Sequence, residues 1–191
     1  MEALKERIQL EGRVEKNCIL KVDNFLNHQI DVLFFLEIGK EFKKRFPNEK
    51  VDKILTIEAS GIGVAFAVSQ AFGNVPVVFA KKREGTFNNL DAHLSKVYSY
   101  TKEKEYEIMV DKRYIKPGEK ILIIDDFLAN GSAAQGLVDI VESGSAILVG
   151  VGIVIEKGFQ EGRKKLQKNN VKVESLAIIK EFSNNKVVFD Q

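Results

Sequence analysis

The chain has 191 residues, of which 45% are hydrophobic and 29% charged, a composition that excludes disordered and fibrous classes and allows one globular domain. Its 29 basic and 27 acidic residues give no reason to expect a general nucleic-acid or membrane-surface binder. Cys18 is the only cysteine, which excludes a disulfide framework, and its β-prone setting predicts an ordinary buried thiol.

The N-terminal residues MEALKERIQLEG carry charges where a secretory signal would be apolar. No run approaches the roughly 18 apolar residues of a membrane span. His28 and His93 have no second His or Cys at metal-ligand spacing, which argues against a zinc site. We therefore expect a cytoplasmic protein without membrane or nucleic-acid partners.

Hydrophobic periodicity predicts strands and helices that alternate along most of the chain. This is the pattern of βαβ units, with parallel strands and right-handed crossovers, and the fully apolar strands indicate a sheet covered on both faces. In chain order, the expected elements are a helix over 1–10, a β-prone stretch over 14–22, a turn-rich segment over 23–31, a helix from an Asp31 N-cap to Arg45, a strand over 51–57, a helix over 64–72, a strand over 75–80, a long exposed loop over 81–95, a hairpin of 96–101 and 106–110, a strand from 121 to the acids at 125 and 126, a helix over 135–143, a strand over 146–155, a helix over 159–169, and strands over 171–179 and 186–189.

Three turns follow strands in this plan, at 58–63, 81–95 and 125–133. The carboxyl ends of parallel strands share one edge of a sheet, and open α/β sheets bind their ligands at that edge. The three turns are therefore candidates for a single site.

The stretch 121–133, ILIIDDFLANGSA, is the most informative of the three. Its small residues at 129–133 let successive backbone N–H groups point inward at the start of the next helix, an arrangement that binds phosphate. Two carboxylates would repel a phosphate beside them, and they suit sugar hydroxyls or a divalent cation. Strand ending and helix capping would need only one acid. The pattern therefore predicts a receptor for a phosphorylated sugar.

The turn EASGIG (58–63) has Gly61 and Gly63 but Phe66 where a dinucleotide fingerprint needs its third glycine, and GxxxxGK[ST] is absent from the chain. The turn could present N–H groups to a second anion such as pyrophosphate, or be an ordinary strand-to-helix turn. Positive charge at 81–83 follows a strand and is a candidate for the site. The basic runs 43–45 and 163–165 are expected to be solvated faces.

These residues resemble a known family. ILIIDDFLANG (121–131) resembles the phosphoribosyl-diphosphate signature of type I phosphoribosyltransferases, where apolar residues precede two acids and a small-residue phosphate loop. Four stretches look like the Bacillus-type bacterial xanthine phosphoribosyltransferases, and the likeness covers almost the whole chain in order. They are LKVDNFLNHQID (20–31), ILTIEASGI (54–62), LIIDDFLANG (122–131) and GIVIEKGFQ (152–160).

The resemblance implies the α/β type I phosphoribosyltransferase fold, a mostly parallel twisted sheet flanked by helices. It also implies a single domain over 1–191, with a small hood from about 13–30 plus the C-terminal strands and a flexible lid loop at about 81–105. Homodimers are the family norm.

The implied activity is purine salvage: transfer of 5-phosphoribose from phosphoribosyl diphosphate to N9 of xanthine, with Mg²⁺ accompanying the donor. No protein ligand of the metal is assigned. The resemblance implies that the ribose faces two catalytic acids, Asp125 and Asp126, and that xanthine is held by Leu20, Asn27 and Lys157. It implies that the 5′-phosphate is bound by Ala129, Asn130, Gly131, Ser132 and Ala133. The pyrophosphate is expected to be surrounded by Glu58, Ala59, Ser60, Gly61 and Lys81.

The sequence departs from the family pattern at one position, and it leaves alternatives for the substrate and the function. Hypoxanthine-guanine relatives carry an acid at the position of Ala129, and an alanine cannot titrate, so we assign no general base. Phe25 and Phe159 could stack on the purine, but aromatic residues beside strand ends are more often core. The alternatives are another purine substrate (guanine, hypoxanthine or adenine) or a regulator that binds phosphoribosyl diphosphate without catalysis.

Overall fold

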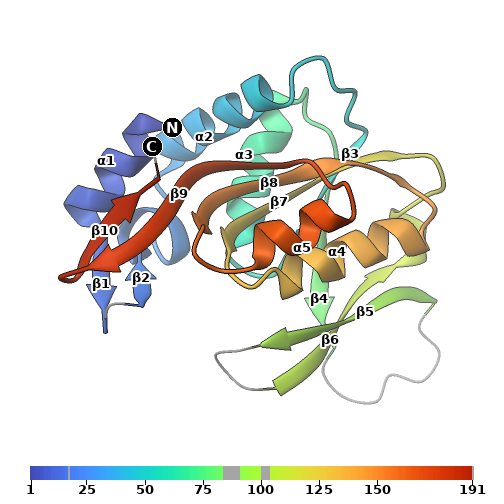
Figure 1. Ribbon diagram of the computed structural model, residues 1–191. Coiled ribbons are helices and arrows are strands. Elements are labelled where there is room, and N and C mark those ends of the chain that lie inside the picture. The colour runs from blue at the N-terminus through green and yellow to red at the C-terminus, as the bar shows by residue number, and fades with distance from the viewer. Residues whose placement is uncertain (17, 84–90, 100–103, 191) are drawn as a thin grey trace.

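The computed structural model describes residues 1–16, 18–83, 91–99 and 104–190 (Figure 1). Five α-helices and ten strands lie in these ranges, with one π-helical turn and one 3-10 turn. The helices are α1 (Glu2–Glu11), α2 (Val32–Arg45), α3 (Gly61–Ala71), α4 (Ser132–Ser143) and α5 (Gly162–Lys168), and the two turns are η1 (Asp23–Asn27) and η2 (Lys112–Tyr114). The strands are β1 (Arg13–Glu15), β2 (Ile19–Lys21), β3 (Lys53–Ile57), β4 (Val77–Lys82), β5 (Ala92–Ser99), β6 (Lys104–Asp111), β7 (Lys120–Leu128), β8 (Ile147–Lys157), β9 (Val173–Ser183) and β10 (Lys186–Phe189).

Eight strands form one sheet in the order β10-β9-β8-β7-β3-β4-β6-β5. The five central strands, β9, β8, β7, β3 and β4, run parallel, and the strands at both edges are antiparallel. The predicted mostly parallel α/β sheet flanked by helices is confirmed. β1 and β2 form a separate two-stranded hairpin, which Figure 1 shows below α1.

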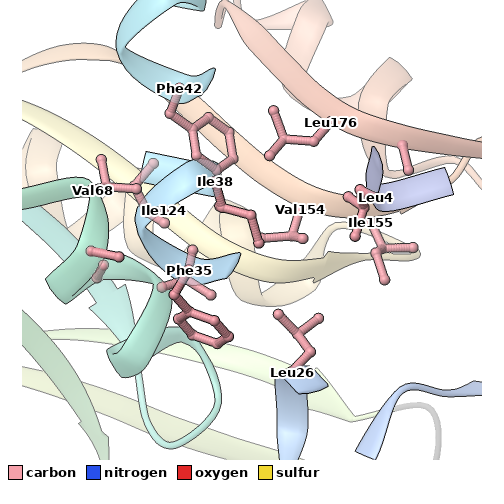
Figure 2. Close-up of a cluster of buried hydrophobic side chains, with 14 of the residues drawn as sticks. Leu4, Leu26, Phe35, Ile38, Phe42, Val68, Ile124, Val154, Ile155 and Leu176 are labelled. Carbon is pink, nitrogen blue, oxygen red and sulfur yellow. The ribbon is translucent and has the colours of Figure 1, made fainter. Parts of the chain in front are cut away.

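The sheet has an apolar core on each face. On one face, α1, η1, α2 and α3 cover residues such as Ile124 and Val154, and Figure 2 shows Phe35, Ile38 and Phe42 of α2 packed into this core. On the other face, α4, α5 and the β5–β6 hairpin cover Ile121, Ile123 and their neighbours. Every residue of β3 is buried, as expected for a strand covered on both faces.

Local chemistry explains the element boundaries that the sequence predicted well. The Asp31 side chain accepts a hydrogen bond from Phe34 N at the start of α2, as an N-cap should, and the helix ends at Arg45 as expected. The hairpin of β5 and β6 is antiparallel as predicted, and its turn at 100–103 lies outside the described residues. None of the helices described is long and apolar enough to cross a membrane.

Several boundaries were wrong. The helices after the two glycine turns begin three residues earlier than predicted, at Gly61 and Ser132, because small residues there continue the helix. β4 runs to Lys82 and β5 begins at Ala92, so sheet pairing takes both ends of the predicted 81–95 loop. Residues 84–90, the centre of that loop, lie outside the described residues.

Candidate functional site

The carboxyl-end edge of the parallel strands brings the predicted turns together. β3 lies between β4 and β7 and runs parallel to both, so the segments after these strands meet at one edge, as predicted. The turn after β3 is also bonded directly to the end of β4, because Lys82 N donates to Glu58 Oε1 at 2.7 Å.

The two acids lie within β7, where the prediction had the strand end at them. β7 continues to Leu128 because its pairing with β8 extends through Phe127 and Leu128. Asp125 is 4% exposed and Asp126 8% exposed. Two adjacent carboxylates are therefore held almost out of water at the sheet edge, which is costly unless a ligand or cation meets them.

Burial dominates the electrostatics of this pair. Desolvation raises the pKa of Asp125 well above its usual range, and the negative charge of Asp126 raises it further. The backbone N–H of Asp126 donates to Asp125 Oδ1 at 3.0 Å, which opposes the shift. The pair is thus prepared to accept positive charge or hydroxyl donors nearby.

The predicted phosphate loop at 129–133 turns back sharply after β7. Gly131 has φ +85°, a left-handed conformation that favours glycine, and α4 begins at the next residue. Asn130 Oδ1 accepts from Ser132 N at 3.0 Å and so fixes the loop. The loop lines a cavity of about 180 Å³ at the start of the twelve-residue helix α4, where backbone N–H groups and the helix dipole favour an anion.

The predicted pyrophosphate turn packs closely against Asp125 at Gly61. A Cβ at Gly61 would lie 2.2 Å from Thr56 Oγ1 and 3.0 Å from Asp125 Oδ1, so only glycine fits there without movement. Ala59 is exposed, Ser60 and Glu58 are partly exposed, and the Glu58–Ala59 peptide is cis. Lys81 lies exposed on β4, with its Nζ 5.7 Å from the centre of the Phe79 ring.

The predicted base residues come from three separate segments. Lys157 ends β8, and its Nζ donates to the carbonyl of Cys18 in the β1–β2 turn at 3.0 Å. This bond joins the Lys157 side chain to the hairpin that carries Leu20, which is 7% exposed. Burial lowers the pKa of Lys157. Asn27 lies exposed at the end of η1, just after this hairpin.

Three expectations about single side chains were wrong or are now decided. Cys18 is exposed, because the β-prone run 14–22 divides into a hairpin and places it in the turn. Phe25 is fully buried core, whereas Phe159 is 47% exposed and meets Phe182 edge-to-face at 5.7 Å. Arg163, expected on a solvated face, instead forms a partly buried ion pair with Glu156 at 2.6 Å.

The structure adds residues that the sequence reading missed. Tyr98 and Tyr106 line the cavity beside the phosphate loop, although they come from the β5–β6 hairpin. Burial and the charge of Asp125 raise the pKa of Tyr106, so its hydroxyl stays a hydrogen-bond donor. Phe182 lies 6.0 Å from Lys157 Nζ. Only the order of strands in the sheet brings these rings to the site, and no local signal marks them.

The match to known proteins agrees with this geometry. A model of the phosphoribosyl transferase domain matches residues 23–189. The chain belongs to the phosphoribosyltransferase family. Three relatives are named xanthine phosphoribosyltransferase: one from Clostridioides difficile is 60% identical over 189 residues, and those from Clostridium perfringens and Laribacter hongkongensis are 59% identical. Each alignment covers 99% of this chain and 100% of the relative.

Solved structures share the fold at much lower identity. Adenine phosphoribosyltransferase from Thermoanaerobacter pseudethanolicus matches with a TM-score of 0.74 and 22% identity, over 92% of this chain and 98% of that one. The enzyme from Giardia lamblia matches with a TM-score of 0.75 and 19% identity, over 92% and 96%. The type I phosphoribosyltransferase fold expected from the sequence is confirmed.

Proposed function

We propose that this protein transfers the 5-phosphoribosyl group from phosphoribosyl diphosphate to N9 of xanthine, forming xanthosine 5′-monophosphate and pyrophosphate. The observation that carries phosphoribosyl transfer is the pair of buried acids followed directly by the phosphate loop and its cavity. The choice of xanthine is supported by the near-full-length identity of 57–60% to relatives named for that base.

The donor lies along the sheet edge. Its 5′-phosphate occupies the loop from Ala129 to Ala133, where N–H groups and the start of α4 stabilise a dianion without a lysine. Asp125 and Asp126 accept from the ribose hydroxyls. The pyrophosphate lies at the turn from Glu58 to Gly61, with Lys81 nearby on β4.

A divalent cation fits the oxygen ligands that the carboxylates and the substrate phosphates would offer. No group of three or more His, Cys, Asp or Glu in the described part of the chain could hold a metal alone. Mg²⁺ commonly binds one or two carboxylates together with substrate phosphates, and the buried pair Asp125 and Asp126 supplies such carboxylates. When bound with the donor, Mg²⁺ would neutralise negative charge that develops on the departing pyrophosphate.

In the reaction, the bond from ribose C1′ to the pyrophosphate oxygen breaks and its electron pair leaves with pyrophosphate, while the N9 lone pair forms the new bond to C1′. Positive charge builds on the sugar ring, and the carboxylates of β7 favour it by Coulomb attraction. No titratable side chain lies in the phosphate loop, so we propose that xanthine reacts after losing its proton to solvent. Rates across a series of purines should then follow the acidity of the base, and equal rates would contradict this step.

On the acceptor side, Lys157 can only donate, which suits a purine carbonyl, whereas the Asn27 amide can donate and accept. Leu20 contributes an apolar wall. Because Lys157 Nζ already donates to the Cys18 carbonyl, the base enters beside a hairpin that is tied to the end of β8.

The decisive experiment gives the purified protein phosphoribosyl diphosphate and Mg²⁺ with xanthine, guanine, hypoxanthine or adenine in turn, and follows nucleotide formation. We expect xanthine to have the highest kcat/KM. A preference for another purine would overturn the base assignment. Donor binding without turnover of any purine would favour the regulator.

We further propose a cytoplasmic homodimer, in which residues 13–30 and the C-terminal strands form a hood; the expected lid at 81–105 falls partly on paired strands and partly on residues outside those described. Apolar side chains exposed on and beside α2 and α3 support a second copy as the partner, since isolated domains rarely expose several together. They are Ile30, Val32, Leu33 and Phe66, which are 49%, 65%, 76% and 62% exposed. Light scattering on the wild type and on Leu33→Lys/Phe66→Lys tests this, and an unchanged mass would exclude this face.

A further inference from the structure

An ion pair with a buried carboxylate lies beside both halves of the site. Glu156 is 2% exposed and receives a bidentate pair of hydrogen bonds from Arg163, with Nε to Oε1 at 2.8 Å and Nη2 to Oε2 at 2.6 Å. Ser175 Oγ donates to Glu156 Oε2 at 2.5 Å, and Arg163 Nη1 donates to Val173 O at 3.1 Å. We call Glu156, Arg163 and Ser175 the Glu156 cluster.

The cluster is placed one residue from each half of the site. In the ladder between β7 and β8, Glu156 pairs with Leu128, and the phosphate loop begins at the next residue, Ala129. On β8 itself, the residue after Glu156 is Lys157. Glu156 therefore lies one position from the phosphate loop across the sheet and one position from the lysine proposed to hold the base along β8.

The first turn of α5 is in direct contact with the phosphate loop. Gly162 N donates to Ala129 O at 3.1 Å. A Cβ at Gly162 would lie 2.5 Å from that carbonyl, and a Cβ at Gly131 would lie 2.9 Å from Gly162 Cα. Arg163 follows Gly162 in the chain. Its bidentate hydrogen bonds to Glu156 therefore fix how closely α5 approaches the phosphate loop.

Stability alone does not account for this arrangement. Replacing a buried ion pair by apolar residues of similar size is often neutral or stabilising, because the desolvation cost offsets the attraction between the charges. A bidentate Arg–carboxylate pair does, however, fix geometry in a way that apolar packing does not.

We propose that the Glu156 cluster is a positioning unit that sets the phosphate loop in the conformation that binds the donor, through the contact of Gly162 with Ala129 and Gly131. This rests on the proposed function, in which that loop holds the 5′-phosphate. Since hydrogen bonds weaken steeply when their geometry is lost, a loop displaced by loss of the cluster binds the donor more weakly even in a well-folded protein.

The test compares the wild type with Glu156→Leu/Arg163→Met/Ser175→Ala, which removes both charges together, so that neither is left unpaired, at the loss of the hydrogen bond to Val173 O. The matched control is Lys53→Met/Glu119→Leu, because Lys53 and Glu119 form a partly buried pair at 2.6 Å near the opposite ends of β3 and β7. Thermal midpoints, the Kd of phosphoribosyl diphosphate in the absence of base, and the KM of both substrates are measured on each.

For the triple variant we expect a thermal midpoint close to that of the wild type and a donor Kd raised by about tenfold, equivalent to roughly 1.4 kcal/mol. The control should keep the wild-type Kd. An unchanged donor Kd in the triple variant would overturn the proposal, and so would an equal rise in the control. If the triple variant does not fold, Arg163→Lys keeps the charge but loses the fork, and a wild-type Kd there would overturn the proposal.

The proposed function is tested separately in the same experiment. Donor binding is measured without base, so it does not depend on which purine is used. Wild-type protein that binds the donor but does not turn over xanthine would count against the function and leave the positioning result intact.

Discussion

The donor half and the acceptor half of the site are built in different ways. The donor half is one continuous stretch, from the buried acids of β7 through the left-handed Gly131 to the start of α4, and it works mainly through backbone groups. The acceptor half joins the end of β8, a two-stranded hairpin and η1. The bond from Lys157 Nζ to Cys18 O joins β8 to the hairpin, and an ion pair of 3.7 Å between Arg13 and Asp23 joins the hairpin to η1.

This difference separates rigid binding of the phosphate from selection among purines. A phosphate is common to every donor molecule, so a backbone loop packed against α5 suits it. A purine must be distinguished from other purines by a few hydrogen bonds, and side chains on separate segments can change without disturbing the loop. Changes in the donor half should therefore abolish or weaken all reactions, whereas changes in the acceptor half should alter the base.

Asp125→Asn should have the largest effect. It keeps the shape of the buried side chain but removes its charge, and we expect kcat to fall roughly a hundredfold or more, because stabilisation of charge in the transition state is lost. Steady-state kinetics at saturating donor measures this. A kcat near that of the wild type would contradict a catalytic role for the carboxylate.

The same variant should stabilise the protein without ligand. The folded-state pKa of Asp125 is raised, so its stabilising contribution is fully present below the unfolded pKa of about 3.9 and is lost as pH rises through the folded pKa. At neutral pH, Asp125→Asn should therefore raise the thermal midpoint, and its advantage over the wild type should shrink on acidification. A lower midpoint than the wild type at neutral pH would contradict this.

Gly131→Ala should act next most strongly, on the donor. The left-handed φ costs about 1 kcal/mol for alanine, and the new Cβ would meet Gly162 Cα at 2.9 Å, so the KM for phosphoribosyl diphosphate should rise by about tenfold or more. Gly118→Ala is the control, because Gly118 has φ +76° but no atom within 4 Å of its Cβ position. It should lose similar stability and keep the wild-type KM.

Lys157→Ala should affect the acceptor by a smaller factor. A hydrogen bond from a charged donor contributes about 1.5–3 kcal/mol, so the KM for xanthine should rise about tenfold while donor binding changes little. Lys172→Ala is the control, since Lys172 Nζ donates to a backbone carbonyl, that of Arg45, at 3.1 Å. Equal losses for donor and base in Lys157→Ala would contradict its assignment.

Cys18→Ser should have the smallest effect. The hydrogen bond from Lys157 goes to the carbonyl of Cys18, and the Cys18 side chain is exposed, so the KM for xanthine should stay within about twofold of the wild type. A larger change would mean that the thiol itself takes part in the acceptor site. Initial rates at several xanthine concentrations decide this.

The contrast between the two halves also explains what the sequence could predict. The acids and the small-residue loop are neighbours in the chain, so their chemistry could be inferred from 13 residues read in order. The parallel direction of β3, β4 and β7 followed from strand and helix alternation, whereas their order in the sheet did not. The assignment of Lys157, Asn27 and Leu20 rested on resemblance, because no periodicity connects residues more than a hundred positions apart.

Contacts that depend on tertiary packing were beyond the sequence. The exposure of Cys18 depends on where the nine-residue β-prone stretch 14–22 turns into a hairpin, and the pairing of Arg163 depends on which side of α5 meets β8 and β9. Tyr106 reaches the cavity only because β6 pairs antiparallel with β4. In each case the local pattern of charge or hydrophobicity was compatible with either an exposed or a buried side chain, and tertiary packing decided between the two.

A crossed two-substrate experiment tests this division of labour most directly. The KM values for phosphoribosyl diphosphate and xanthine would be measured over a full grid of concentrations for the wild type, Gly131→Ala and Lys157→Ala. We predict that Gly131→Ala raises the KM for the donor and Lys157→Ala raises the KM for xanthine, each leaving the other substrate within about threefold. Variants that each raise both values equally would contradict it.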